Sequence, residues 1–276
     1  MIKSYRWLAA AALMLAGTAA QASPWSDASS PAPGPAEAIG KPAAGCLAGA
    51  ATLPLEGPGF QVIRTSRNRY YGLPENVAFI EALGEKARVA SIPDFYVGDM
   101  SLPRGGPMPT GHDSHQTGLD VDIWFNLDAK PTLPAWARED VPLPSMLTAN
   151  AKAIDPKLFG SRQVALLRLA ASFPTVDRIF VNPVIKRALC QGVAGAAVGG
   201  RSWLHKIRPW PGHDEHFHVR LNCPAGDATC VAQAPVPPGD GCDATLDWWF
   251  KPHQPNPAAG PHVPILPAAC RWLIAH

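Results

Sequence analysis

The sequence predicts an α+β domain built from short strands and short helices. Residues 119–125 and 216–221 alternate apolar with polar side chains, as half-buried β-strands do. Residues 76–89 instead repeat apolar side chains at helical spacing. Proline accounts for 31 of the 276 residues, about twice its usual share. This proline content excludes long helical bundles and coiled coils and favours a loop-rich body.

The chain begins with the features of a secretory signal peptide. Lys3 and Arg6 are basic, residues 7–20 are apolar, and Ala20-Gln21-Ala22 fits the small-x-small cleavage pattern. A retained membrane anchor would need about 20 apolar residues, which is more than this stretch offers. We therefore expect residues 1–22 to be removed on export.

The charge balance of the exported chain argues against binding by bulk electrostatics. The whole chain has a formal charge of +2, and removal of the two basic residues of the signal leaves 22 Lys+Arg against 22 Asp+Glu. A neutral chain with few charges has no sustained basic face. Nucleic acid is therefore not an expected partner, and no stable membrane span is expected once the signal is removed.

Residues 23–45 are rich in proline, alanine, serine and glycine, so we expect an extended leader before the folded domain. The domain, residues 46–276, is of a length that suits one core, although two are not excluded. Its expected elements, in chain order, are strands at 60–64, 95–99, 119–125, 178–181 and 216–221 and helices at 76–89, 161–172 and 183–190.

Local signals support these elements. The first helix has one apolar face, formed by Val77, Ile80, Leu83 and Ala87. Ser161 can cap the second helix, and Asn182 followed by Pro183 opens the third. On strand 119–125, Asp120 and Asp122 share a face with Trp124, so we expect a half-buried strand with an acidic outer face.

The six cysteines indicate structural disulfides, because they are even in number and spread over an exported chain. They are Cys46, Cys190, Cys223, Cys230, Cys242 and Cys270. Six cysteines allow 15 pairings, and only Cys223 and Cys230 are close enough to suggest a local loop closure. No Cys-x2-Cys pair occurs, which argues against a zinc knuckle. The position of Cys270 indicates that the proline-rich tail is joined to the body.

Two short histidine clusters lie about 100 positions apart. The later one contains His213, His216 and His218, and the last two project from one face of a strand because side chains alternate along it. The earlier one contains His112 and His115.

A carboxylate follows the earlier cluster at a suitable distance. His115 precedes Asp122 by seven residues, and Gly118 between them can form a turn that brings the carboxylate back toward the imidazole. Two histidines and one carboxylate can bind zinc and leave a fourth position open for water. The same ligand types also bind iron in oxygenases, but no other feature indicates oxygen chemistry.

The competing interpretation of each residue is structural. A solitary histidine on a strand usually bonds a backbone carbonyl, and Asp120 or Asp122 alone would form a solvated strand face. The combination favours metal, and zinc would lower the pKa of a bound water to about 7. No Ser-x-x-Lys or Gly-x-Ser-x-Gly motif occurs, so we expect neither a serine acyl-enzyme nor acylation by β-lactams.

Longer strings make the pattern specific. Residues 111–124 read GHDSHQTGLDVDIW, residues 206–210 read KIRPW, and residues 212–220 read GHDEHFHVR. These strings closely resemble the family of penicillin-insensitive murein endopeptidases, in the zinc peptidase group that includes lysostaphin-type peptidases and D-alanyl-D-alanine dipeptidases. Shorter matches, including Gly98-Asp99-Met100, extend the resemblance over nearly the whole exported chain.

The resemblance implies roles for the histidines. His115, Asp122 and His218 match zinc ligands, and His112 matches a histidine beside the metal that binds it or a second ion. His213 and His216 match histidines that handle protons and stabilise the oxyanion, which suits imidazoles near neutral pH.

The resemblance also implies a fold. It is a small antiparallel sheet that carries the metal site, with flanking helices and three disulfides. The implied pairs are Cys46–Cys270, Cys190–Cys242 and Cys223–Cys230.

Two departures qualify the resemblance. Some relatives have a second metal at a dimer contact, which would allow a homodimer, but residues 146–159 contain no histidine. Glu215 lies where the dipeptidase branch places a catalytic glutamate. A continuous strand would turn it away from His218, whereas a strand that begins at His216 would let it serve as general base. Asp120 is expected to orient a ligand histidine.

We therefore expect a periplasmic zinc endopeptidase that cleaves the D-alanyl to meso-diaminopimelyl cross-link of peptidoglycan. The alternatives are a related amidase, carboxypeptidase or dipeptidase, and a non-catalytic wall-binding module with structural zinc. Trp124, Trp203 and Trp210 are expected in a substrate groove or in the core. Arg104 is expected to meet a substrate carboxylate or to be solvated.

Overall fold

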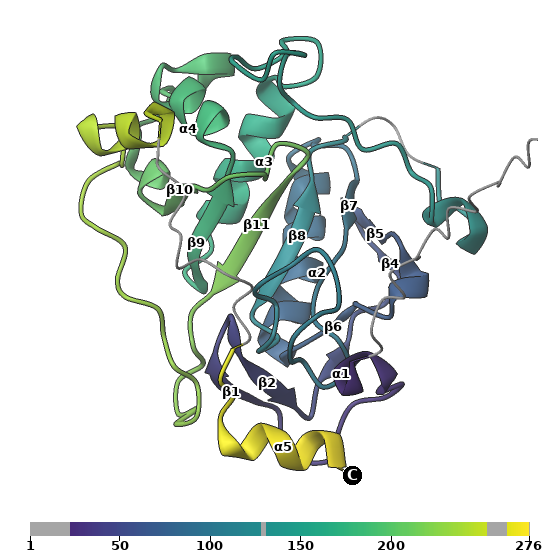
Figure 1. Ribbon diagram of the computed structural model, residues 1–276. Helices are drawn as coiled ribbons and strands as arrows, with labels where there is room; N and C mark the ends of the chain where they lie inside the picture. The colour runs from purple at the N-terminus through teal and green to yellow at the C-terminus, as the bar shows by residue number, and fades with distance from the viewer. Residues whose placement is uncertain (1–22, 128–130, 253–263, 276) are drawn as a thin grey trace, which may run out of the picture.

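A computed structural model describes residues 23–127, 131–252 and 264–275 (Figure 1). The predicted signal peptide, residues 1–22, lies outside the described residues. None of the helices within the described ranges has both the length and the apolar composition needed to cross a membrane.

A seven-stranded sheet forms the centre of the domain, in the order β10-β9-β11-β8-β7-β5-β4. Its strands are β4 (Glu56–Gly57), β5 (Phe60–Val62), β7 (Phe95–Val97), β8 (Asp120–Trp124), β9 (Val176–Val181), β10 (Ile207–Pro209) and β11 (His216–Leu221). The five expected strands are present, with β11 at the expected residues. The expected α+β class is confirmed.

The sheet is larger than expected and mixed rather than wholly antiparallel. β5 pairs with β7 in parallel, and so does β9 with β10. Parallel neighbours need a crossover connection. Helix α2 (Pro74–Val89) lies between the first two strands in sequence, and α4 (Pro183–Cys190) lies between the second two.

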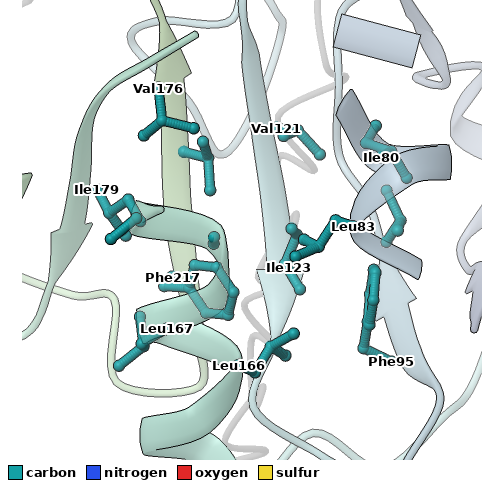
Figure 2. Packing of buried hydrophobic residues seen from close by; sticks show 14 of the residues in the cluster. Ile80, Leu83, Phe95, Val121, Ile123, Leu166, Leu167, Val176, Ile179 and Phe217 are labelled. Atoms are coloured by element: carbon teal, nitrogen blue, oxygen red, sulfur yellow. The ribbon is translucent and has the colours of Figure 1, made fainter. Parts of the chain in front are cut away.

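The core lies between the sheet and two helices, α2 and α3 (Ser161–Ala171). Figure 2 shows Leu83 of α2 directed toward Ile123 of β8, and Ile80, Leu166 of α3 and Phe217 of β11 belong to the same buried cluster. All five are at most 1% exposed. Burial of this face fixes which side chains of β8 and β11 point to the opposite face, because side chains alternate along a strand.

The N-cap expected from the sequence is present in α4 but not in α3. Asn182 caps α4 as expected, because its side-chain oxygen accepts the Val184 backbone N–H at 2.9 Å. Ser161 does not cap α3. Gly160 is the N-cap, and its backbone N–H donates to the Gln163 side chain at 2.9 Å.

The expectation that β8 is half-buried with an acidic outer face was wrong, because all five of its residues are buried. Asp120 and Asp122 are 0% and 1% exposed. The loop before β8 covers them, since the His115 backbone N–H donates to Asp120 Oδ2, and Arg220 of the adjacent strand covers Asp120 from the other side. The alternation of apolar and polar residues along a strand does not show that other segments of the chain bury its polar face.

The expectation of an extended leader at 23–45 was also wrong. This segment contains helix α1 (Pro24–Asp27), strand β1 (Glu37–Lys41) and the start of β2 (Ala44–Ala48), which pairs antiparallel with β1. The stabilising partners are distant in sequence: the Gly40 N–H donates to the Thr229 carbonyl at 2.9 Å. A composition poor in large apolar residues therefore does not indicate an extended chain here.

Three disulfides connect the periphery to the domain, with the pairing that the family resemblance implied. Cys46–Cys270 joins β2 to helix α5 (Ala268–Ala275) at one end of the molecule (Figure 1). Cys190–Cys242 joins α4 to the segment before the 3-10 helix η5 (Ala244–Phe250). Cys223–Cys230 closes a local loop. The expected attachment of the tail is confirmed.

The remaining elements are short. They are the antiparallel strands β3 (Ala51–Thr52) and β6 (Tyr71–Gly72) and the 3-10 helices η1 (Thr65–Arg67), η2 (Ala135–Arg138), η3 (Val193–Gly195) and η4 (Ser202–Lys206).

The disulfides should contribute unequally to stability. Cys46 and Cys270 are 224 residues apart and Cys223 and Cys230 only 7. Loop-closure entropy then predicts that a Cys46→Ala/Cys270→Ala variant loses about 5 kcal/mol of unfolding free energy, and the matched Cys223→Ala/Cys230→Ala variant about 2.5 kcal/mol. Urea unfolding of both variants measures the difference, and equal losses would contradict this explanation.

Candidate functional site

The pairing of β8 with β11 brings the two sequence clusters together. His218 lies opposite Asp122 in the antiparallel register, and Arg220 lies opposite Asp120. These side chains share the sheet face opposite α2 and α3. The i, i+2 spacing of His216 and His218 predicts that their side chains share one face of a strand. The register decides which residues of β8 lie opposite them.

His112 and His115 reach the same place from the loop between β7 and β8. The loop is fixed by backbone contacts: the His115 N–H donates to Asp120 Oδ2 at 3.0 Å, and Ser101 donates to the His115 carbonyl. His115 has φ of 66°, a left-handed conformation that non-glycine residues adopt only when surrounding contacts hold them.

The Asp122 carboxylate is the centre of the cluster. Its oxygens lie 3.4 Å from His115 Nε2, 3.6 Å from His112 Nδ1 and 3.3 Å from His218 Nδ1. Ligand atoms of His112, His115 and Asp122 all lie within 4.8 Å of one another and could hold a metal ion. His218 joins them from β11, with its ring centroid 4.5 Å from that of His115.

Several of these polar atoms are buried without a hydrogen-bond partner among the described residues. They include both ring nitrogens of His115 and Asp122 Oδ1. A buried polar atom left unsatisfied costs about 1–3 kcal/mol. A cation bound beside Asp122 would be a partner for the buried atoms that face this carboxylate. The set of donor atoms therefore fits a metal.

The pKa values fit the same conclusion. Burial, opposed by Asp122, lowers the pKa of His115 to about 4, so its imidazole is neutral and can bind a metal at pH 7. Burial would also lower the pKa of His218, but Asp120 and Asp122 together raise it to about 9. Arg220 balances the charge of Asp120, and the charge of Asp122 can be balanced by a proton on His218 or by a metal ion.

Asp120 lies behind His218. Its Oδ1 lies 3.3 Å from His218 Nε2, and Arg220 contacts both of its oxygens, at 2.7 Å and 2.8 Å. Because Nε2 faces Asp120, Nδ1 faces Asp122. This placement agrees with the expected orienting role of Asp120.

Asp99 lies behind His112 and was missed by the sequence reasoning. Its Oδ2 lies 3.1 Å from His112 Nε2 and 2.7 Å from Arg69 Nη1, and Arg67 lies 3.1 Å away. Burial would raise the pKa of Asp99, but His112 and Arg69 lower it to about 2. The string Gly98-Asp99-Met100, used only as part of the resemblance, was the signal that could have identified it.

His213 and His216 lie beside the cluster, with ring centroids 5.0 Å apart, and that of His213 is 5.8 Å from that of His218. Burial lowers the pKa of both, that of His213 to about 4, so both imidazoles are neutral at pH 7. His213 Nδ1 lies 2.9 Å from the Pro211 carbonyl, which requires the proton on Nδ1 and leaves Nε2 as the acceptor.

Glu215 does not join the cluster. It is exposed, and among the described residues no hydrogen bond or ion pair links its carboxylate to these histidines. Its backbone carbonyl accepts the Phe125 N–H at 3.0 Å, and burial and Asp214 raise the pKa of its side chain. The strand begins at His216, yet the side chain is not directed to the site.

The tryptophans expected in a groove or in the core have different positions. Trp124 is 4% exposed, and its ring contacts His216 with centroids 4.9 Å apart. Trp203 packs against the core. Trp210 is 52% exposed and lines a cleft of about 370 Å³ together with His112, His213 and His218.

Arg104 does not reach the cleft. Its guanidinium donates to the backbone carbonyls of Ser30 and Leu273, which makes it a structural contact between the N-terminal segment and α5.

The contact between Asp99 and His112 should affect metal affinity. An Asp99→Asn variant keeps the shape of the side chain but removes its charge, and we expect zinc binding to weaken about 10–100-fold. Competition with a chromophoric chelator measures this without reference to activity. The matched control is Asp113→Asn, an exposed aspartate in the same loop, and equal affinities of the two variants would contradict the prediction.

Comparison with known proteins shows the family of this chain. The family model for penicillin-insensitive murein endopeptidase matches residues 38–275. The protein of that name from Haemophilus influenzae is 45% identical over 243 residues, 87% of this chain and 83% of that protein. The one from Yersinia enterocolitica is 42% identical over 274 residues, 98% of this chain and 97% of that protein. The chain therefore belongs to the penicillin-insensitive murein endopeptidase family.

Proposed function

We propose that this protein is a zinc-dependent endopeptidase that hydrolyses the D-alanyl to meso-diaminopimelyl cross-link of peptidoglycan in the periplasm, after removal of residues 1–22. The observation that carries the proposal is the buried cluster of His115, Asp122 and His218, the last of which also lines a cleft. Family membership and the names of the relatives support the reaction class and murein as the polymer.

In this proposal His115, Asp122 and His218 hold the metal, and His112 lies beside it. When bound there, zinc would polarise the scissile carbonyl and lower the pKa of a bound water. Asp120 and Asp99 keep His218 and His112 in the orientation that presents Nδ1 of each ring to the cluster. Zinc is preferred over iron because the family is one of metallopeptidases, whose hydrolysis needs no redox change.

His213 and His216 handle protons in the proposed reaction. Hydrolysis of an amide requires a proton to move from the attacking water to the departing nitrogen. A neutral imidazole can accept that proton and then return it, and the contact of His213 with Pro211 leaves Nε2 available for the task. The protonated ring would also stabilise the oxyanion.

The expectation of a homodimer gains no support from the fold or from the comparisons, and the proposal does not depend on it.

Metal removal should abolish cleavage. Purified cross-linked muropeptide dimers are incubated with protein treated with a chelator, and with the same protein after zinc is restored. Mass spectrometry should show conversion to monomers only with zinc. Binding without cleavage would favour the wall-binding module. Release of other fragments would identify an amidase, carboxypeptidase or dipeptidase.

Substitution can decide whether His213 or Glu215 acts as the general base. A His213→Ala variant should lower kcat about 10²–10⁴-fold, as loss of a general acid–base does, while its zinc content stays unchanged. A Glu215→Gln variant should keep near-normal turnover, because that carboxylate is exposed. The opposite pattern would assign the general base to Glu215.

A further inference from the structure

A series of aromatic side chains leads from the histidine cluster to the protein surface. The ring of Phe180 on β9 lies 5.3 Å from that of His218, and the ring of Trp210 lies 5.9 Å from Phe180. Trp249 follows 5.9 Å from Trp210, and Trp248 lies 4.9 Å from Trp249. None of the four aromatic residues is used to hold the metal or to move a proton.

The series begins inside the cleft. Phe180 and Trp210 line it together with His112, His213 and His218. Trp248 and Trp249 belong to η5 outside this lining. A ligand whose reacting bond lies over the histidines and which extends past Trp210 would therefore meet η5 next. We call Trp210, Trp248 and Trp249 the aromatic platform.

The platform exposes apolar surface that a ligand could cover. Trp210 is 52% and Trp248 50% exposed. Neighbouring large apolar side chains on a soluble protein surface are a common mark of a binding site, because their exposure to water costs free energy. Indole rings combine a broad apolar face with a polar N–H, which suits ligands that have both kinds of surface.

The segment that carries Trp248 and Trp249 is fixed to the domain. The disulfide Cys190–Cys242 ties it to α4, and the buried Lys186 donates to the Asp240 carbonyl at 2.6 Å. Leu246 of η5 is buried. A surface fixed in this way loses little conformational freedom on binding, which favours affinity.

We infer that the aromatic platform binds sugar rings of the glycan strand that carries the cross-linked peptide, an inference that rests on the proposed function. A pyranose ring presents C–H groups on its faces and hydroxyl and acetamido groups at its edge, which match an indole face and its N–H. Asp247 of η5 is paired with Arg187 of α4 at 4.0 Å, so these two charges partly cancel. With 22 charges of each sign after removal of the signal, stacking rather than electrostatic attraction would hold the polymer.

The first test uses an uncharged, peptide-free sugar. The exported chain is labelled with ¹⁵N-tryptophan and titrated with the tetramer of N-acetylglucosamine, and the indole N–H signals are followed by NMR. The signals of Trp210 and Trp248, identified by Trp→Phe variants, should shift in a saturable way. Absence of shifts, or shifts confined to tryptophans outside the platform, would overturn the inference.

Substitution on the platform sharpens this test. A Trp248→Ala variant should bind the tetramer at least fivefold more weakly. The matched control is Trp136→Ala, because Trp136 is also exposed, at 79%, and belongs to η2. Arg138 of η2 pairs with Glu56 of β4, and β4 forms the edge of the sheet opposite β10. Equal weakening by both substitutions would also overturn the inference.

The second test separates this inference from the proposed function. Trp248→Ala should reduce cleavage of cross-linked glycan strands more than cleavage of a sugar-free peptide dimer. The ratio of kcat/KM for the glycan substrate to kcat/KM for the peptide dimer should fall at least fivefold. If the unmodified chain binds the tetramer but cleaves neither substrate, the proposed function fails and the sugar subsite stands. If it cleaves both and the substitution changes both equally, the subsite fails and the proposed function stands.

Discussion

The buried carboxylate of Asp122 is the constraint around which this site is organised. It is 1% exposed and lies in the middle of the sheet, where an uncompensated charge would be very costly. Imidazoles of His112, His115 and His218 surround it at 3.3–3.6 Å. This arrangement is stable only if positive charge is present among these groups, and a bound metal ion would supply it. The candidate metal site and the stability of this part of the fold thus have the same electrostatic origin.

Two further carboxylates surround this centre and follow one pattern. Asp120 lies behind His218 and is paired with Arg220, and Asp99 lies behind His112 and is paired with Arg69. Each carboxylate fixes the orientation of an imidazole, and each arginine balances the carboxylate so that it can be buried. The orientation of these imidazoles is therefore set by residues that lie outside the candidate metal site.

The periphery of the domain has a comparable role for the polymer. Disulfides and backbone hydrogen bonds hold proline-rich segments that have too few apolar residues to pack by themselves. One of these segments, fixed through Cys190–Cys242, places η5 beside the cleft. In the proposal made above, the enzyme recognises the peptide at the sheet and the glycan on this attached segment.

The sequence by itself determined the local features. Alternation located β8 and β11, the Asn182-Pro183 pair located the start of α4, and the spacing of His216 and His218 placed them on one face. These features depend on side-chain periodicity and capping within a few residues, which a single sequence contains.

Only the tertiary structure decided the rest. It buried the acidic face of β8, built a hairpin from residues 37–48, and placed Asp99 behind His112. These outcomes depend on partners far away in sequence, such as Arg220, 100 residues from Asp120, and Asp227, whose carboxylate accepts the Ala38 N–H from 189 residues away. No local periodicity encodes such contacts, because they form only when the chain closes on itself.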